Sequence, residues 1–217
     1  MTDFKLKEAY ELLLSDAWIF TPTLIIFIIF LLMMAGLFIG FLALIFNAIA
    51  GLDFLYLFIM FLAWILVFMV VACLSYQFIF IMTSVLARNA LSGGKAGSDF
   101  FIQSLKANTV KIVMASVAVT IANIFLSLTM VGPIILGFIL YFAPFYMAKG
   151  EGVFESFSKS YRFVRENLRE VLIIYLLYFG GIVISAYLMY LPLLFFIPWI
   201  IVLSQFYFED RLESCEI

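Results

Sequence analysis

Histidine is absent from this chain of 217 residues, and charged side chains are scarce. The commonest metal ligand and the commonest acid–base catalyst are therefore missing, and no Ser-His-Asp triad can form. Two cysteines, Cys73 in an apolar run and Cys215 near the polar end of the chain, imply no disulfide framework. These absences predict that the protein is not an enzyme and has no catalytic residue, metal site or cofactor.

Apolar residues dominate instead. They make up 67% of the chain and charged residues 12%, whereas a soluble domain is about half apolar and about a quarter charged. The chain is therefore predicted to be an integral membrane protein. A formal net charge of −2 and the lack of a basic tail argue against a nucleic-acid partner. Residues 1–18 lack the pattern of a cleaved signal peptide, so the first apolar run is expected to remain in the mature protein.

Six apolar runs predict an all-helical fold with six membrane spans, each of which needs roughly 20 residues. The second run, about 33 residues or about 50 Å as a straight helix, exceeds the hydrocarbon core of roughly 30 Å. We expect it to protrude, with Ser75, Tyr76 and Gln77 at the interface. Residues 88–99 form a polar break and residues 209–217 a polar tail. The six runs cover about residues 21–46, 54–86, 109–130, 133–148, 170–190 and 192–208.

The placement of basic residues predicts the orientation. All twelve Lys and Arg residues lie before the first span, between the second and third, between the fourth and fifth, or after the sixth. The opposite turns contain none, and Asp53 is their only charge. The positive-inside rule then predicts a multi-pass protein of the cell (plasma or inner) membrane with both termini cytoplasmic. The alternative, an odd number of spans, would place one basic segment outside.

Residues 152–172 form the most charged stretch of the chain. At about 100° per residue, six apolar side chains fill one arc of a helix. Arg162, Arg165 and Arg169 fall on the arc beside it. An apolar face flanked by arginines, just before a long apolar run, is typical of an amphipathic helix lying in the membrane interface. The apolar positions are Phe154, Phe157, Tyr161, Val164, Leu168 and Val171.

Two weaker copies of this stretch occur in the chain. Residues 157–167 (FSKSYRFVREN) align without gaps on residues 6–16 (LKEAYELLLSD), and residues 100–108 (FFIQSLKAN) form a shorter copy. Each copy precedes two spans. We therefore predict a single membrane domain, residues 1–217, built from three repeats of an interfacial helix plus a helical hairpin, at about residues 1–87, 96–148 and 151–208. The alternative is that any helix entering a membrane from the cytoplasm has this pattern.

Short motifs extend this pattern to a known group. The motifs are the segment SDAWIFTP and two glycine-bearing segments, one before FSKSYR (from Phe157) and one before FIQSLK (from Phe101). With them, the chain resembles the six-span membrane domain of some glycerophosphodiester phosphodiesterases and related uncharacterised bacterial and archaeal membrane proteins. The resemblance implies a six-helix membrane domain and transfers no catalytic residue. The soluble phosphodiesterase barrel of those fused proteins is absent here.

Two groups of side chains are candidate sites. Arg162, Arg165 and Arg169, and more weakly Lys106 and Lys111, are predicted to contact anionic phospholipids or a protein partner on the cytoplasmic face. The alternative is that the arginines only hold the segment inside and pair with Glu166 and Glu170. The second group is intramembrane and polar: Asn123, Thr120 and Ser116, with Ser127 on roughly the same side. It predicts a polar cavity wall or, alternatively, a hydrogen bond between helices.

Small and aromatic residues complete the predictions. The pairs Gly36/Gly40 and Gly180/Gly181 are expected to be packing points within the bundle. Six aromatic residues are expected to form belts at the membrane interfaces. They are Tyr141, Tyr146, Tyr187, Tyr190, Trp199 and Tyr207.

Two functional hypotheses follow. The first is a non-enzymatic multi-pass membrane protein that docks lipid headgroups or a partner protein through amphipathic helices on its cytoplasmic face. The second is a transporter of a small molecule or lipid, or the substrate-binding subunit of one, with a polar cavity near Asn123 and Asn47.

Overall fold

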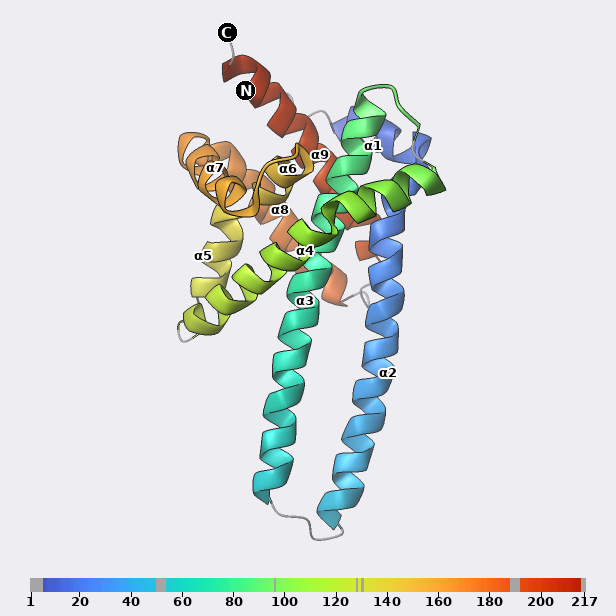
Figure 1. Cartoon of the computed structure of the whole chain (residues 1–217), viewed down its shortest axis with the longest axis vertical. Coiled ribbons are helices and arrows are strands. Elements are labelled where there is room, and N and C mark those ends of the chain that lie inside the picture. Colours follow the sequence, from blue (N-terminus) through green and yellow to red (C-terminus); the bar gives the residue numbers. More distant parts are fainter. Residues whose placement is uncertain are drawn as a thin grey trace.

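The computed structural model describes residues 6–49, 54–95, 97–127, 129, 131–187 and 192–215, and these contain helices and no strand (Figure 1). The predicted all-helical fold is confirmed for this part of the chain. In order, its elements are α1 (Leu6–Ser15), the 3₁₀ turn η1 (Ala17–Phe20), α2 (Thr21–Ile49), α3 (Phe54–Leu91), α4 (Ser98–Leu126), α5 (Gly132–Ile139), α6 (Ala143–Ala148), α7 (Val153–Glu166), α8 (Leu168–Tyr187) and α9 (Leu193–Cys215).

Five of the described helices are long and apolar enough to cross a membrane, as expected for a membrane protein. They fall in α2, α3, α4, α8 and α9. The fourth predicted span is different, because Gly132–Ala148 is a shorter apolar segment. It is divided between α5 and α6, so six unbroken spans are not present among the described elements.

Proline explains the break between α5 and α6. Pro144 has no backbone N–H, and its ring would clash with the carbonyl four residues earlier, so a helix cannot continue through it without a kink. The chain instead makes shorter-range bonds, from the Tyr141 amide to the Phe138 carbonyl (3.3 Å) and from the Ala143 amide to the Leu140 carbonyl (3.0 Å). The hydroxyl of Ser160, on α7, donates to the Ile139 carbonyl at 2.8 Å. The break is thereby tied to the neighbouring helix.

Aromatic residues around this break form the centre of the core. Tyr141, Phe142 and Phe145 are fully buried and contact the rings of Phe80 on α3 and Phe208 on α9.

The predicted aromatic belt is wrong for three of its members, because Tyr141, Tyr146 and Tyr207 are buried in this core. Trp199 is half-buried against it. Tyr190 and the side chain of Tyr187 lie outside the described part of the structure.

Helix α3 is the longest element and packs against α2, α4, α6 and α9. Its second half is buried in the bundle, whereas its first half, like much of α2, is exposed. Figure 1 shows these halves of α2 and α3 continuing well past the turn between α4 and α5. The sequence predicts that the excess length of this helix protrudes from the membrane, with Ser75, Tyr76 and Gln77 at the interface. That prediction is wrong, because Gln77 is buried within the bundle and Ser75 and Tyr76 are half-buried.

Helix α4 corrects the prediction of a separate second amphipathic segment. Residues 100–108 form the first turns of one continuous helix that also contains the third predicted span. In the aligned copies the helix stops at Asp16, whose carboxylate accepts from the Trp18 amide, and at Asn167, the C-cap of α7. The position aligned with Asn167 in α4 is Lys111, which does not interrupt the helix. One face of α4, mostly of polar or small residues, is buried along the helix, and its buried residues are Phe101, Ser104, Asn108, Ile112, Ala115, Ser116 and Thr120.

Burial is similar at the aligned positions of the three copies. The small residue before the tyrosine or leucine position is buried in each copy, as Ala9, Ser104 and Ser160. The residue four positions later is buried too, as Leu13, Asn108 and Val164. Three helices thus present the same two positions to the bundle.

Glycine allows close packing at one of the predicted positions. A Cβ atom at Gly181 would overlap the ring of Phe196, so α8 approaches α9 closely there. A Cβ atom at Gly36 would have no described neighbour within 4 Å, and one at Gly40 would meet only Trp64, at 3.9 Å. The packing prediction is confirmed for Gly181, whereas added Cβ atoms at Gly36 and Gly180 meet no described neighbour within 4 Å.

Gly181→Ala is expected to lower the apparent melting temperature in detergent, at a cost of about 1–3 kcal/mol, because the added methyl group overpacks the α8–α9 contact. Thermal unfolding followed by circular dichroism measures this. Gly180→Ala is the matched control, since its added methyl group meets no neighbour, and it should be neutral or stabilising. The added change Phe196→Leu should restore stability to Gly181→Ala. Equal effects at the two glycines would contradict the close approach.

Candidate functional site

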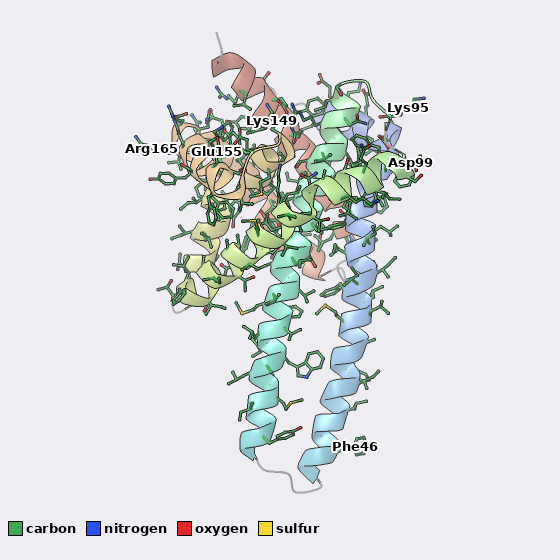
Figure 2. All side chains as sticks on the ribbon, viewed as in Figure 1. Phe46, Lys95, Asp99, Lys149, Glu155 and Arg165 are labelled. Carbon is green, nitrogen blue, oxygen red and sulfur yellow. The ribbon has the colours of Figure 1, made fainter. Side chains whose placement is uncertain are left out.

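Charged side chains gather at one end of the molecule. Figure 2 shows Lys95, Asp99, Lys149 and Glu155 at this end, far from Phe46 near the other end. Helix α1 and the end of α9 lie at the charged end as well (Figure 1). The alternation of basic segments with turns that lack Lys and Arg along the sequence predicts that charged residues lie at one end, and these labelled residues do.

Helix α7 presents three different faces. The first is buried against the bundle and consists of Val153, Ser156, Ser160, Phe163 and Val164. The second is apolar and outward: Phe154 is 70% exposed and Tyr161 is 52% exposed. The third carries the charged residues. The six-residue apolar arc predicted from sequence is thus divided, since Val164 and Val171 are buried while Phe154, Tyr161 and Leu168 are exposed.

Two small side chains account for the close packing of the buried face. Ser156 and Ser160 are both fully buried. The Ser156 hydroxyl donates to the Gly152 carbonyl at 2.7 Å, and that of Ser160 to the Ile139 carbonyl of α5. Each hydroxyl is therefore satisfied without an acid–base partner, which favours a packing role over a nucleophilic one.

The predicted arginine stripe does not lie on one helix. Helix α7 ends at Glu166, so Arg169 belongs to the first turn of α8. Arg162 donates through Nε to Glu166 at 2.9 Å, although its side chain is 80% exposed. The predicted pairing with Glu166 is confirmed for Arg162, whereas Glu170 pairs with Arg211 at 3.2 Å. Arg165 and Arg169 are exposed and have no ion-pair partner among the residues that the structure describes.

A polar cleft of about 410 Å³ lies beside α7, at the charged end. Three cations line it, and each already holds a carboxylate: Lys149 with Glu209 (2.7 Å), Lys159 with Glu151 (2.8 Å) and Arg162 with Glu166. Hydrogen bonds to Glu151 and then Glu155 raise the pKa of Lys159, so it stays charged. Because the positive charge is neutralised locally, the cleft is poorly suited to bind a free anion.

The two predicted lysines differ in their surroundings. Lys106 is exposed on the first half of α4. Lys111 is half-buried, and its Nζ donates to the Met147 carbonyl near the end of α6 at 3.1 Å. A cation at a helix C-terminus satisfies a carbonyl that has no intrahelical partner. Lys111 therefore joins α4 to α6 and is not available on the same surface as the arginines.

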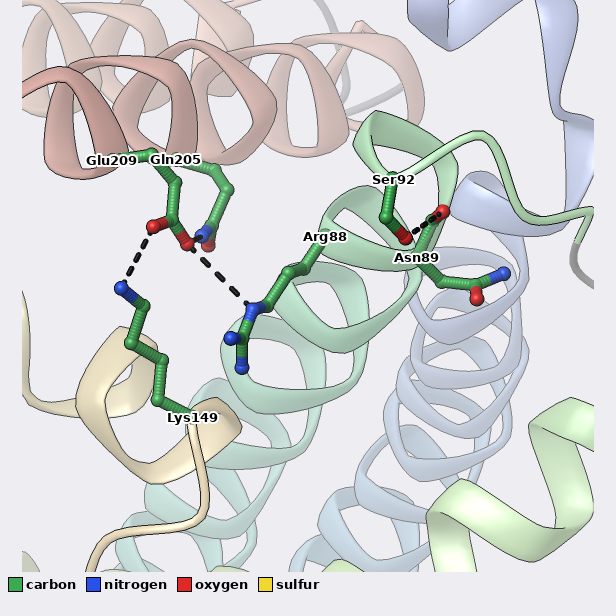
Figure 3. Close-up of polar contacts among 6 residues, drawn as sticks. All are labelled: Arg88, Asn89, Ser92, Lys149, Gln205 and Glu209. Carbon is green, nitrogen blue, oxygen red and sulfur yellow. Dashed lines mark hydrogen bonds and ion pairs between the residues drawn. The ribbon is translucent and has the colours of Figure 1, made fainter. Parts of the chain in front are cut away.

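One carboxylate joins three helices at the charged end (Figure 3). Glu209 on α9 contacts Lys149 at the end of α6 (2.7 Å) and Arg88 near the end of α3 (3.8 Å). Gln205 also donates to it, at 2.7 Å. The Lys149 ammonium lies 5.2 Å from the centre of the Phe208 ring. With Lys149 22% and Glu209 25% exposed, water screens the pair only partly.

The intramembrane polar group lies where α4 meets α3. Ser116 and Thr120 are buried, and Ser116 donates to the Ile112 carbonyl of its own helix at 2.6 Å. Asn123 is half-buried, and its Nδ2 donates to Cys73 Sγ of α3 at 3.7 Å. The predicted hydrogen bond between helices is therefore present, though weak. Ser127 is exposed and lies apart from this group.

A second cavity, of about 240 Å³, lies between α3, α4 and α5 beside Asn123. Asn123 lines it, whereas Ser116 and Thr120 do not. Gln77 lines it too and is only 3% exposed. Sequence reasoning placed Gln77 at an interface and so missed it. The side chain of Asn47, the other residue predicted for a cavity, lies outside the described part of the structure.

Glu209→Gln is expected to lower the apparent melting temperature. It removes the charge that two cations share and should cost about 1–2 kcal/mol, since the group is partly buried. Glu11→Gln is the matched control, because Glu11 pairs with Lys7 at 3.6 Å on the exposed side of α1 and should contribute less than about 0.5 kcal/mol. Thermal unfolding of both variants at low salt measures the difference. Equal melting temperatures would contradict the role of Glu209.

Comparison with known proteins adds nothing to this geometry. No protein-family model, curated protein or solved structure matches the chain. The resemblance to a phosphodiesterase-associated membrane domain therefore stays a prediction. Within the described residues, no group of three or more Cys, Asp or Glu side chains could hold a metal ion.

Proposed function

We propose that the protein is a non-enzymatic multi-pass membrane protein that docks anionic lipid headgroups at its cytoplasmic face through α7 and the start of α8. The observation that carries the proposal is the outward side of α7. There, exposed aromatic side chains lie next to an arginine that forms no ion pair with a described residue. Headgroup docking needs both features, because the apolar side chains enter the acyl boundary while the guanidinium reaches a phosphate.

The order of residues around α7 supports this arrangement. At about 100° per residue, Arg165 follows Phe154 and Tyr161 directly around the helix. Arg162 and Glu166 lie further round, toward water. The apolar surface continues into α8, where Leu168 and Leu172 are exposed. Arg169 adds a second cation without a described partner at the start of that helix. Guanidinium groups suit this position because their planar donors match phosphate oxygens.

The other copies of the stretch support a common interfacial position for this end of the molecule. Helix α1 also has an outward apolar stripe, formed by Leu6, Tyr10 and Leu14, beside its buried Ala9 and Leu13. Tyr10 and Tyr161 occupy aligned positions and are exposed to a similar extent. Only the copy at residues 157–167 carries arginines beside the stripe. The copy at residues 6–16 has Glu11 and Leu14 at the positions aligned with Arg162 and Arg165. Headgroup recognition is therefore assigned to α7.

The proposal includes two interfacial helices, α1 and α7, with six membrane crossings and both termini inside the cell. The concentration of Lys and Arg at one end supports this orientation. Lys106 lies on the exposed side of α4 at the same end and contributes to the positive surface. The broken α5–α6 segment serves as the fourth crossing. About 1 kcal/mol for each basic residue near an anionic surface is enough to enrich anionic lipid around α7.

Replacement of Arg162, Arg165 and Arg169 by alanine is expected to lower the amount of anionic phospholipid that co-purifies with the protein. With three contacts of about 1 kcal/mol each, retention should fall at least tenfold at low salt. Native mass spectrometry of protein from vesicles of equal phosphatidylglycerol and phosphatidylethanolamine content measures the bound lipid. Arg165→Ala alone should cause more of the loss than Arg162→Ala, because Arg162 is held by Glu166.

Two controls separate docking from a general charge effect. The triple change to lysine keeps the charge and should retain most of the lipid, with some loss of phosphate geometry. Lys7→Ala together with Lys95→Ala removes exposed charge elsewhere at the same end and should leave bound lipid unchanged. Unchanged lipid in a folded alanine variant would refute the proposal. Loss of a co-purifying protein instead would favour a protein partner on this face.

Spin labels at neighbouring positions test the depth of α7. In a variant with Cys73 and Cys215 replaced by serine, a label at Phe154→Cys should collide more with oxygen than with a water-soluble nickel chelate. A label at Glu155→Cys should show the opposite preference, because it lies on the charged side. Electron paramagnetic resonance in vesicles measures both accessibilities. Equal accessibility to the chelate at both positions would place α7 in water.

Carriage of a small molecule or lipid is the second candidate. The cavity beside Asn123 favours it, because polar groups line a space among helices that are long enough to cross a membrane. A transport pathway needs in addition a second state that opens the site to the other side. Transport therefore ranks below headgroup docking.

A further inference from the structure

Two amide oxygens of residues that line the cavity between α3, α4 and α5 have no described hydrogen-bond donor. Gln77 Oε1 and Asn123 Oδ1 are buried atoms that have no hydrogen-bond partner among the described residues. Both side chains line the cavity. An amide oxygen withheld from water without a donor costs about 1–3 kcal/mol, so such atoms are normally satisfied in a folded protein. Two of them in one cavity indicate that something else supplies the donor.

The described contact of Asn123 uses its nitrogen and leaves its oxygen without a described partner. Its Nδ2 donates to Cys73 Sγ, which turns Oδ1 away from that contact. Gln77 lies one helical turn after Cys73 on α3, so both polar side chains belong to the same part of the cavity. Tyr76, whose phenol carries a hydroxyl, also lines the cavity, and the other lining residues are small or apolar, with Val119, Leu136 and Leu140 among them.

The chemistry of the wall limits the ligand. Among the described residues that line the cavity, none is Lys, Arg, Asp or Glu. A charged ligand would therefore lack a counter-charge at low dielectric, which is strongly unfavourable. The group that meets Gln77 and Asn123 must be neutral and must donate a hydrogen bond, and a hydroxyl group meets both conditions.

The size and opening of the cavity limit the rest of the molecule. An apolar cavity of about 150 Å³ holds benzene, so one of about 240 Å³ suits roughly nine or ten non-hydrogen atoms. Ala72 on its rim is exposed, and Cys73 and Val119 are half-buried, so the cavity opens at the surface of the bundle. Exposed Val117, Ile121 and Ile124 of α4 surround this region with an apolar surface. A ligand would enter from lipid and not from water.

We propose that this cavity binds the hydroxyl end of a neutral, membrane-dissolved alcohol, with Gln77 and Asn123 accepting its hydrogen bond and the apolar wall enclosing about eight carbons of its chain. The site is separate from the headgroup surface on α7, and either proposal can fail without the other. A longer alcohol extends its chain through the opening into the bilayer. Gln77 is the specificity-determining residue because it is the more deeply buried acceptor.

The test uses the full chain in lipid nanodiscs and an eight-carbon primary alcohol that carries a diazirine. Photolysis followed by peptide mass spectrometry should place saturable label on residues 72–77, 119–123 or 133–140. Excess 1-octanol should displace it, whereas excess n-octane, which lacks the donor, should not. Gln77→Met with Asn123→Leu should weaken competition by octanol roughly fivefold, the factor for one neutral hydrogen bond.

Two further variants make the result decisive. Thr83→Val is the matched control. Thr83 is also on α3, and its buried hydroxyl also has no described partner, but it does not line the cavity. The change should therefore leave labelling unchanged. Val119→Phe keeps both amides but fills the space, and it should abolish saturable labelling while melting near the wild-type temperature. Label spread over lipid-facing residues, or displaced equally by octane and octanol, would overturn the proposal. Unaltered octanol competition in the double variant would overturn it too.

Discussion

Confinement of Lys and Arg to one end is the constraint on which the rest of the structure depends. Ionic side chains cannot be held in hydrocarbon without a large free-energy cost, so the apolar runs must cross in pairs that return the chain to the same end before the next basic segment. The alternation of basic segments with turns that lack Lys and Arg meets this requirement. Helix hairpins follow from it, and so do the ion pairs that gather where the hairpins meet.

Packing at the charged end depends on the break at Pro144. Because α5 stops early, the break between α5 and α6 places aromatic residues in the centre of the bundle, where Tyr141 bonds to Ser204 of α9 at 3.0 Å. Ser204 already donates to the Ile200 carbonyl, so the tyrosine is the donor. The same break places Lys149 against Glu209 and the Ile139 carbonyl against Ser160. The contacts of this break therefore help to hold α7 with its buried face toward the bundle.

The sequence predicted elements whose cause is local. Long apolar runs gave the helices, and Asp16 and Asn167 marked helix ends because their side chains compete with backbone hydrogen bonding. Features with a tertiary cause were missed. Tyr141 and Tyr207 have the composition of an interfacial belt, yet neighbouring helices bury them. Nothing in the local pattern of α4 signals that it continues through Lys111. The cavity forms where three helices meet beside Gln77. No spacing of residues along the chain predicts that these helices meet there.

The arginine residues show the same limit. Periodicity put them beside an apolar arc, and this holds for Arg165. Pairing of Arg162 with Glu166 is an i,i+4 contact that spacing alone anticipates. Arg169 belongs to α8 because α7 ends at Glu166, and the periodicity does not predict that end. The proposed headgroup docking therefore depends on the few cations that the fold leaves without a described carboxylate, and not on the count of basic residues.

Reaction of single cysteines with a membrane-impermeant maleimide tests the central claim most directly. The cysteines replace Lys95, Glu155 or Tyr56 in a chain whose own two cysteines are serine, in right-side-out and inside-out vesicles. The account predicts that the positions of Lys95 and Glu155 react only from the cytoplasmic side, and the position of Tyr56, in the first turn of α3, only from the opposite side. Reaction of Glu155→Cys and Tyr56→Cys from the same side would contradict it.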